Sequence, residues 1–224
     1  MVNEHPQRYF SLDKTLVANL KSDLEALLKT YSGSELKAVE VTGLIIAKYS
    51  EEHRAYHNLS HIQALLGQAE NFRDKFDDEE SVRLAVWFHD AVYEPQSQAN
   101  EIESARLAVE SLTKLNFPQA KIERVEKMIL ATEKHDAFGL ETDGKLFLDL
   151  DLGILGAGAE VYKKYAEAIR REYSFVPEKL YREKRREILE SFLQRKFIYY
   201  TNELREFLEE PARINIANEI KELL

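Results

Sequence analysis

Histidines and aspartates stand where apolar segments begin or end, and such residues could hold a metal ion together. His57 and His61 lie four positions apart in YHNLSHI, so they would share one face of a helix. His89 and Asp90 are adjacent at the end of the apolar run VWFHD. Neutral imidazoles and carboxylates are ligands of borderline and hard divalent cations, so metal binding is the first chemistry that these residues suggest.

Two further aspartates, Asp149 and Asp151, are embedded in the apolar stretch FLDLDLG. A carboxylate in such a place is costly to bury unless it is paired or coordinated. Each feature alone has a plainer explanation, because a His–Asp pair is usually a helix-end hydrogen bond and a DxD pair is usually a cap or a turn. The ordered series of His, His-Asp and Asp favours a shared cation.

Helical periodicity runs through most of the chain and must position these side chains. Ser34 is a predicted N-cap, and a further helix is predicted to begin near Asn58. The segment DDEESVRLAVWFHD begins with acids that suit a helix N-terminus, where Asp77 and Glu80 would form a capping box. Its apolar residues surround the helix on nearly all sides, which predicts a central helix.

The second half of the chain is also predicted to be helical. One helix starts at Pro118 and runs up to His135. The segment KLFLDLDLGILGAGAEVYKKY alternates at its start like a strand, but its composition and later spacing favour a helix. After Pro177 two charged amphipathic helices follow, split near Tyr200 or Pro211.

Composition limits the class of protein. The chain has 224 residues, 44% of them hydrophobic, with 8 glycines and 5 prolines, which favours a globular protein of long helices. Without cysteine, disulfides and thiolate metal sites are excluded. A net charge of −9 disfavours binding to duplex nucleic acid. No apolar run is long enough for a membrane span. Since MVNEHPQRYF lacks the apolar region of a signal peptide, we expect a cytoplasmic protein.

The ordered histidines and aspartates resemble the HD superfamily of metal-dependent phosphohydrolases, whose pattern is H…HD…D on a helical bundle. FHDAVY is similar to the HD box, and DLDLGILGA is similar to the last segment of the family. RAYHNLSHI, NEIESA and PARINIANEI resemble a subgroup of predicted HD hydrolases, over roughly residues 10–222. The resemblance implies an all-α HD-domain helical bundle. We expect a single domain over residues 1–224, with a core at about 10–175 and C-terminal helices 177–224 packed on it.

Carried over residue by residue, the resemblance implies four metal ligands: His61, His89, Asp90 and Asp151. His61 is preferred as the first ligand because HIQALL matches a histidine followed by an apolar helical face. His57 would then contact the substrate or support a ligand. Asp151 is preferred as the last ligand because the family aspartate directly precedes the segment that matches LGILGA. Asp149 could instead orient a ligand histidine.

Besides Asp90, the predicted catalytic residues are Glu94 and His135. Glu94 could position a water molecule or act as general base if the helix continues past Asp90, although a solvated loop acid explains it equally well. His135 could donate a proton to the leaving group or bind phosphate, and a helix C-terminal histidine is the plainer explanation. Lys134 and Arg54 are candidate phosphate anchors among the substrate-binding residues, with His57.

The resemblance implies a metal-dependent phosphohydrolase that acts on a small phosphorylated metabolite, expected to be a nucleotide or related phosphate ester, by attack of a metal-bound water. The cofactor would be a divalent ion: Mn, Fe, Co, Ni, Zn or Mg. Two alternatives are a nucleotide-sensing HD module without activity and a di-iron oxygenase in which His57 and His135 supply further ligands. An exposed aromatic stripe in the C-terminal helices could support a homodimer. We expect no nucleic-acid duplex and no membrane among the partners.

Overall fold

The computed structural model describes residues 13–224, and this part of the chain contains ten α-helices, two short 3-10 helices and no strand. The predicted all-α class is therefore confirmed. The first residues, MVNEHPQRYF, on which the signal-peptide expectation was based, lie outside the described residues. No helix within residues 13–224 is long and apolar enough to cross a bilayer.

The described residues form two compact parts, 13–148 and 149–224, and the boundary falls within helix α7. That both parts belong to one domain stays a prediction. The first part contains seven helices and most of an eighth: α1 (Lys14–Lys29), α2 (Glu35–Lys48), α3 (Leu59–Asn71), η1 (Arg73–Lys75), α4 (Glu79–Phe88), α5 (Asn100–Lys114), α6 (Gln119–Ala131) and α7 (Thr142–Asp151).

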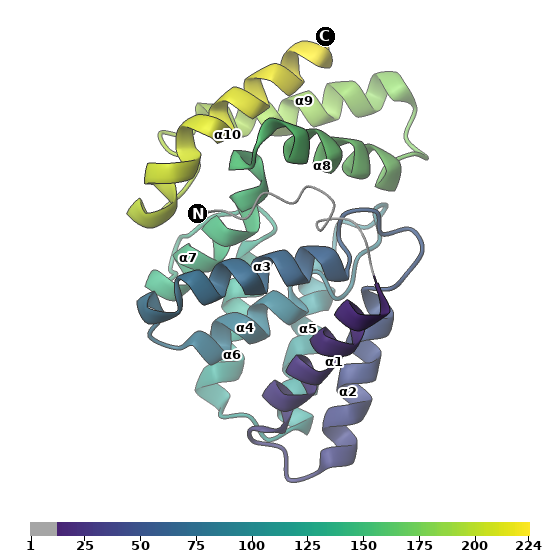
Figure 1. The fold of residues 1–224 in the computed structure, drawn as a ribbon, viewed down its shortest axis with the longest axis vertical. Coiled ribbons are helices and arrows are strands. Elements are labelled where there is room, and N and C mark those ends of the chain that lie inside the picture. Colours follow the sequence, from purple (N-terminus) through teal and green to yellow (C-terminus); the bar gives the residue numbers. More distant parts are fainter. Residues whose placement is uncertain (1–12) are drawn as a thin grey trace. The chain divides into compact units, whose positions relative to one another are not determined.

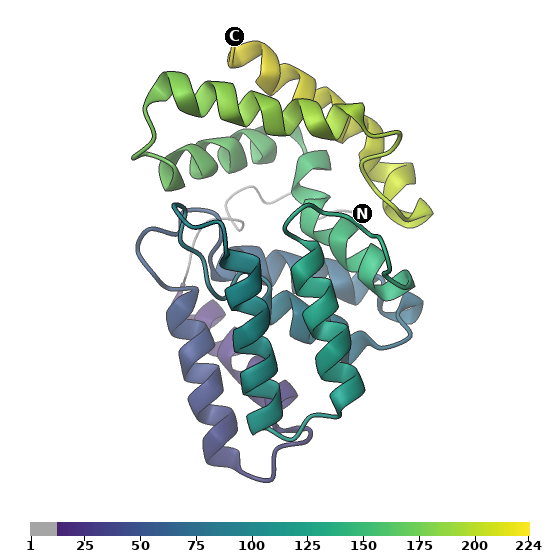
Figure 2. The ribbon, with the colours of Figure 1, turned by 180° about the vertical axis from the view of Figure 1, so that it is seen from behind.

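Helix α4 is the centre of the first part, as its apolar sequence predicts. It packs against α1, α3, α5 and α6. Trp87 and Phe88 at its end are fully buried. Helices α1 and α2 pair with each other, and α5 lies along α6 (Figures 1 and 2). The last turn of α4 is thus held on several sides, which positions the residues that follow it.

Local capping explains where these helices begin. Ser34 accepts a hydrogen bond from a first-turn N–H group of α2, as predicted, and Asn58, near which a helix was predicted to begin, caps α3 in the same way. At α4 the predicted capping box of Asp77 and Glu80 is wrong. Asp78 is the N-cap, because the helix begins at Glu79 and the side chain that immediately precedes it reaches the N–H of the first turn.

One predicted helix end also differs. Helix α6 ends at Ala131 and does not reach His135, whose backbone φ of 45° is left-handed and incompatible with a continuing α-helix. The segment KLFLDLDLGILGAGAEVYKKY, for which a helix was favoured over a strand, is helical: it contains most of α7, the 3-10 helix η2 (Leu152–Gly156) and the start of the next helix at Ala159.

The second part, residues 149–224, contains η2 and three long helices: α8 (Ala159–Glu172), α9 (Glu178–Gln194) and α10 (Asn202–Glu222). The break that separates α9 from α10 lies near Tyr200, one of the two predicted positions. Pro211, the other predicted position, lies inside α10 and does not split it. The packing of α10 on η2 and α9 offsets the hydrogen bond that the proline removes. Within this part, the buried Arg185 pairs with Glu219 at 2.8 Å and joins α9 to α10.

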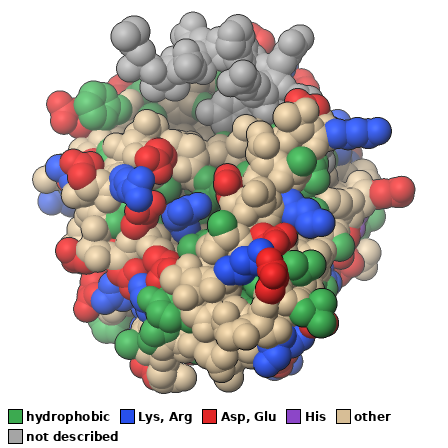
Figure 3. Space-filling model, turned by 60° about the horizontal axis from the view of Figure 1, so that its bottom comes forward, with side chains coloured by type: hydrophobic (Ala, Val, Ile, Leu, Met, Phe, Trp, Pro, Cys, Tyr) green, Lys and Arg blue, Asp and Glu red, His purple; other side chains and the backbone are tan. Residues whose placement is uncertain are grey.

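Charged side chains of both signs alternate over the face drawn in Figure 3, which shows no concentration of Lys and Arg. Charged side chains of the described residues also form ion pairs with one another, such as Lys114 with Glu40 at 2.8 Å. The face in this view is therefore an ordinary solvated surface.

Candidate metal centre

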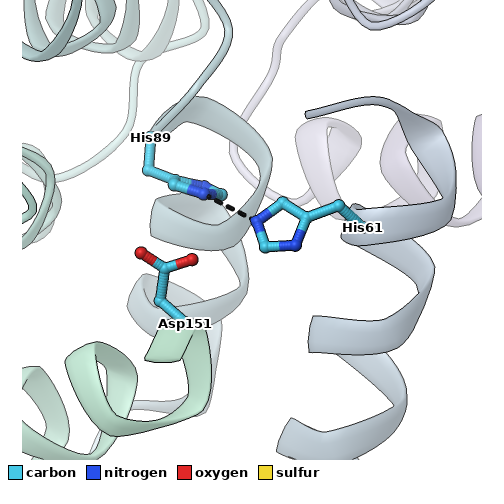
Figure 4. Close-up of side chains that lie close together, drawn as sticks. All are labelled: His61, His89 and Asp151. Carbon is cyan, nitrogen blue, oxygen red and sulfur yellow. Dashed lines mark hydrogen bonds between the residues drawn. The ribbon is translucent and has the colours of Figure 1, made fainter. Parts of the chain in front are cut away.

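Two histidines that are distant in the sequence meet inside the first part of the chain. His61 lies in the first turn of α3, and His89 is the C-cap residue of α4. Their Nε2 atoms are 3.2 Å apart, and their side chains point toward each other (Figure 4). Both residues are buried, with 5% and 1% of their surface exposed. Buried imidazoles that converge in this way need a proton or a cation between them.

The second nitrogen of His89 defines which atom is available as a ligand. His89 Nδ1 lies 2.9 Å from the carbonyl oxygen of Val86. A carbonyl oxygen only accepts, so Nδ1 is the donor and carries the hydrogen. In the neutral ring, Nε2 then presents its lone pair toward His61. A backbone hydrogen bond on the far nitrogen is the usual arrangement of a metal-binding histidine.

The carboxylate of Asp90 completes a group of three atoms. Asp90 Oδ2 lies 3.0 Å from His89 Nε2 and 3.9 Å from His61 Nε2. An oxygen and a nitrogen that both carry lone pairs repel each other unless a positive charge lies near them. The donor set therefore fits a divalent ion. With a metal–nitrogen distance of about 2.0–2.1 Å, two nitrogens at the His61–His89 separation subtend roughly 100° at the ion, close to tetrahedral and octahedral angles.

Asp151, the last residue of α7, forms a second group with the same two histidines, and Asp90 is not a member of that group. One ligand atom each of His61, His89 and Asp151 lies within 4.8 Å of the others, and the carboxylate of Asp151 is drawn beside the imidazole of His89 in Figure 4. The two groups share His61 and His89 and differ in the aspartate. We call His61, His89, Asp90 and Asp151 the candidate metal centre.

Asp149, the alternative to Asp151 as a metal ligand, uses its carboxylate to accept hydrogen bonds from another part of the chain. Its buried carboxylate accepts hydrogen bonds from the main-chain N–H groups of Tyr200 and Thr201, at 2.7 Å each, and from the Thr201 hydroxyl at 2.6 Å. Burial raises the pKa of Asp149, and these hydrogen bonds oppose the increase. Residues two positions apart on a helix point in nearly opposite directions. Asp149 therefore anchors the segment before α10, and Asp151 is the candidate ligand.

His57 lies beside the candidate metal centre and outside the group of possible ligands. It precedes α3, whose N-cap is Asn58, so it does not share a helical face with His61. The two rings are 6.0 Å apart at their centroids, and the half-buried ring of His57 is 4.4 Å from that of Tyr93. Its contact with a substrate stays a prediction.

The predicted general base and proton donor lie in loops. Glu94 is exposed, and α4 ends at Phe88, so the helix that was to carry Glu94 toward the metal does not continue. Its main-chain N–H and carbonyl pair with the side chain of Asn100. His135 follows α6 in a turn. Neither Glu94 nor His135 belongs to the group of possible ligands, and their catalytic roles stay predictions.

The two predicted phosphate anchors differ in their surroundings. Lys134 has a side chain that is 78% exposed and lies 3.7 Å from Glu133. Arg54 is buried, and its guanidinium donates hydrogen bonds to three main-chain carbonyl groups. The structure thus gives Arg54 a task other than the expected phosphate contact. Sequence reasoning missed this task because a single arginine in a loop carries no local signature of a buried role.

Comparison of the chain with protein-family models, with curated proteins and with solved structures found no match. The function is therefore inferred from the donor set of the candidate metal centre and from the motifs that surround it.

Proposed function

We propose that this protein is a metal-dependent phosphohydrolase that acts on a small phosphorylated metabolite, a nucleotide or related phosphate ester. The observation that carries the proposal is the convergence of His61 Nε2, His89 Nε2 and the Asp90 carboxylate within 3.9 Å. The resemblance of FHDAVY and DLDLGILGA to the HD superfamily selects phosphoryl chemistry among the reactions that such a donor set can support.

The residues of the candidate metal centre would hold the ion. A divalent cation at this position would supply electrostatic stabilisation of a phosphoryl group and would acidify a water molecule. The chain contributes orientation: the Val86 carbonyl fixes the tautomer of His89, and α3 and α4 hold the two imidazoles in register. Burial of His61 and His89 excludes bulk water from one side of the site, which strengthens electrostatic interactions there.

A phosphate-release screen tests the proposal. Protein freed of metal by a chelator is assayed on nucleotides and sugar phosphates, each with Mn, Co, Ni or Mg. We expect release with at least one substrate, dependent on added metal. Asp90→Asn should abolish both metal binding and release. Asp74→Ala, which removes an exposed carboxylate on η1, should leave both at the wild-type level.

Three results would contradict the proposal. An Asp90→Asn variant that retains its metal and its activity would remove Asp90 from the centre. Nucleotide binding without release of phosphate under any metal would favour the sensing module. Two irons per chain, with oxygen consumption in place of phosphate release, would favour the oxygenase.

A further inference from the structure

We infer that Arg54 is the positioning residue of the candidate metal centre, because it ties the segment before α3 to the segment after α4. This inference rests on the proposed metal-dependent function. Arg54 lies between Lys48, the end of α2, and Asn58, the N-cap of α3. Its side chain is fully buried. A charge in such a place must be compensated by local partners.

The guanidinium uses four hydrogen bonds, each to a defined acceptor. Nε donates to the carboxylate of Glu51 at 3.0 Å. Nη1 donates to the main-chain carbonyls of His57 and Asp90, at 3.1 and 2.7 Å, and Nη2 donates to that of Ala91 at 3.1 Å. A guanidinium has five N–H groups in a rigid planar fork. Arg54 is therefore committed to the chain and is not a free phosphate anchor.

These acceptors lie on the two sides of the candidate metal centre. The carbonyl of His57 belongs to the turn that leads into α3 and so to His61. The carbonyls of Asp90 and Ala91 follow directly after α4, where the chain leaves the helix. Helix ends leave carbonyl groups without partners inside the helix. By joining both segments, Arg54 fixes the backbone that carries Asp90 and limits how far His61 can move from His89.

Aromatic rings hold the guanidinium in place. Its central carbon lies 5.1 Å from the centroid of the Tyr49 ring and 5.4 Å from that of the Tyr93 ring. The Tyr93 ring in turn lies 4.4 Å from the ring of His57. Planar guanidinium groups stack on aromatic faces in a way that an ammonium group does not reproduce. A lysine at this position would keep the charge but could not bridge three carbonyl groups in one plane.

The test compares cobalt binding by wild type, Arg54→Lys and Arg54→Met. The dissociation constant is measured by titration with Co²⁺, and the visible absorption of bound cobalt reports the geometry of its ligands. Removing a group that orients metal ligands typically weakens metal affinity about 10–100-fold. We expect a loss of this size in both variants and a changed cobalt spectrum in Arg54→Lys.

Arg185 is the matched control, because it is also a buried arginine that pairs with a carboxylate. It lies in α9, and its partner Glu219 lies in α10. Arg185→Lys should lower thermal stability while leaving the cobalt affinity and spectrum of the folded protein unchanged. This comparison separates positioning of the ligands from a general loss of stability.

The outcomes are distinguishable. If Arg54→Lys is folded and binds cobalt with the wild-type affinity and spectrum, the positioning role is overturned and the metal centre survives. If wild type binds no cobalt, the metal centre and this inference both fail. If both Arg54 variants fail to fold, Glu51→Ala, which removes the carboxylate partner of Arg54, takes their place. A weaker affinity with a shifted spectrum then supports the role, and unchanged values overturn it.

Discussion

Asp143, in the first turn of α7, accepts a hydrogen bond at 2.8 Å from the main-chain N–H of Asp78, the N-cap of α4. The N–H of Asp77 donates to the other oxygen of the same buried carboxylate at 2.9 Å. Helix α4 leads to His89, and α7 ends at Asp151. The two helices that carry these candidate ligands are therefore joined near their beginnings.

Loss of the hydrogen bonds between Asp143 and the start of α4 should destabilise the protein. Asp143→Ala leaves two partly buried N–H groups without their acceptor, and an unsatisfied donor of a fully buried group would cost about 1–3 kcal/mol, which sets the upper limit. We expect a decrease of about 1 kcal/mol in the free energy of unfolding, measured by urea denaturation. Asp74→Ala, at an exposed position on η1, is the control and should change stability by less than about 0.5 kcal/mol. Equal stability of the two variants would contradict the role of Asp143.

The cap of α4 should make stability depend on pH. Burial alone would raise the pKa of Asp78, but hydrogen bonds from Lys121 and Ser81 outweigh it and lower the pKa below the ordinary value of 3.8. Because the pKa is lower in the folded protein, the ionised carboxylate stabilises the fold at neutral pH. This contribution is lost as the pH falls from the ordinary value through the folded one.

Asp78→Asn tests this dependence. The substitution should lower the free energy of unfolding at about pH 7, and the difference from wild type should shrink at about pH 3, because the carboxyl of the unfolded wild-type chain takes up its proton before that of the folded chain. Urea denaturation at both pH values measures it. A difference that is as large in acid as at neutral pH would show that the charge of Asp78 is not its source.

Asp149 and Asp151 should separate stability from metal binding. Asp149→Asn replaces an acceptor of three hydrogen bonds by an amide that presents its own N–H groups to the donors of Tyr200 and Thr201. We expect stability to fall by about 1–3 kcal/mol. Asp151→Asn should weaken metal binding without such a loss. Calorimetry of unfolding and of metal binding measures both, and the opposite pattern would exchange the roles of the two aspartates.

Gly156 allows η2 to approach α10 closely. A Cβ atom at this position would lie 2.7 Å from Leu208 Cβ and 2.9 Å from the Leu208 carbonyl oxygen. Gly156→Ala should therefore lower stability by about 1–3 kcal/mol through overpacking. Gly43→Ala in α2, where a Cβ meets nothing within 4 Å, should raise stability by up to about 1 kcal/mol. A stable Gly156→Ala variant would contradict the close packing.

Several features of the fold could be predicted because they depend on local sequence. Apolar residues on nearly all sides of α4 indicate its central position, and side chains that cap helices mark their starts at Ser34 and Asn58. The pair of His89 and Asp90 was predicted from a resemblance in sequence, and the structure brings His61 to His89. Such signals are carried by a few neighbouring residues.

Other features depend on residues far away in the chain, and sequence alone could not supply them. Asp149 is an anchor because Tyr200 and Thr201 donate to it, and these residues follow η2, α8 and α9 in the chain. Arg54 is buried because carbonyl groups from the segment after α4 surround its guanidinium. The left-handed turn at His135 contains no proline or glycine at that position, so the sequence carries no local signal that α6 ends before it.

The most direct test of the metal centre is an anomalous difference map from crystals of the protein grown with saturating Mn²⁺ or Co²⁺. We predict one strong peak at about 2.0–2.3 Å from Nε2 of His61 and of His89, with carboxylate oxygens of Asp90 and Asp151 as further ligands. A map without a peak between these side chains, or with the ion bound only by other residues, would contradict the existence of the centre.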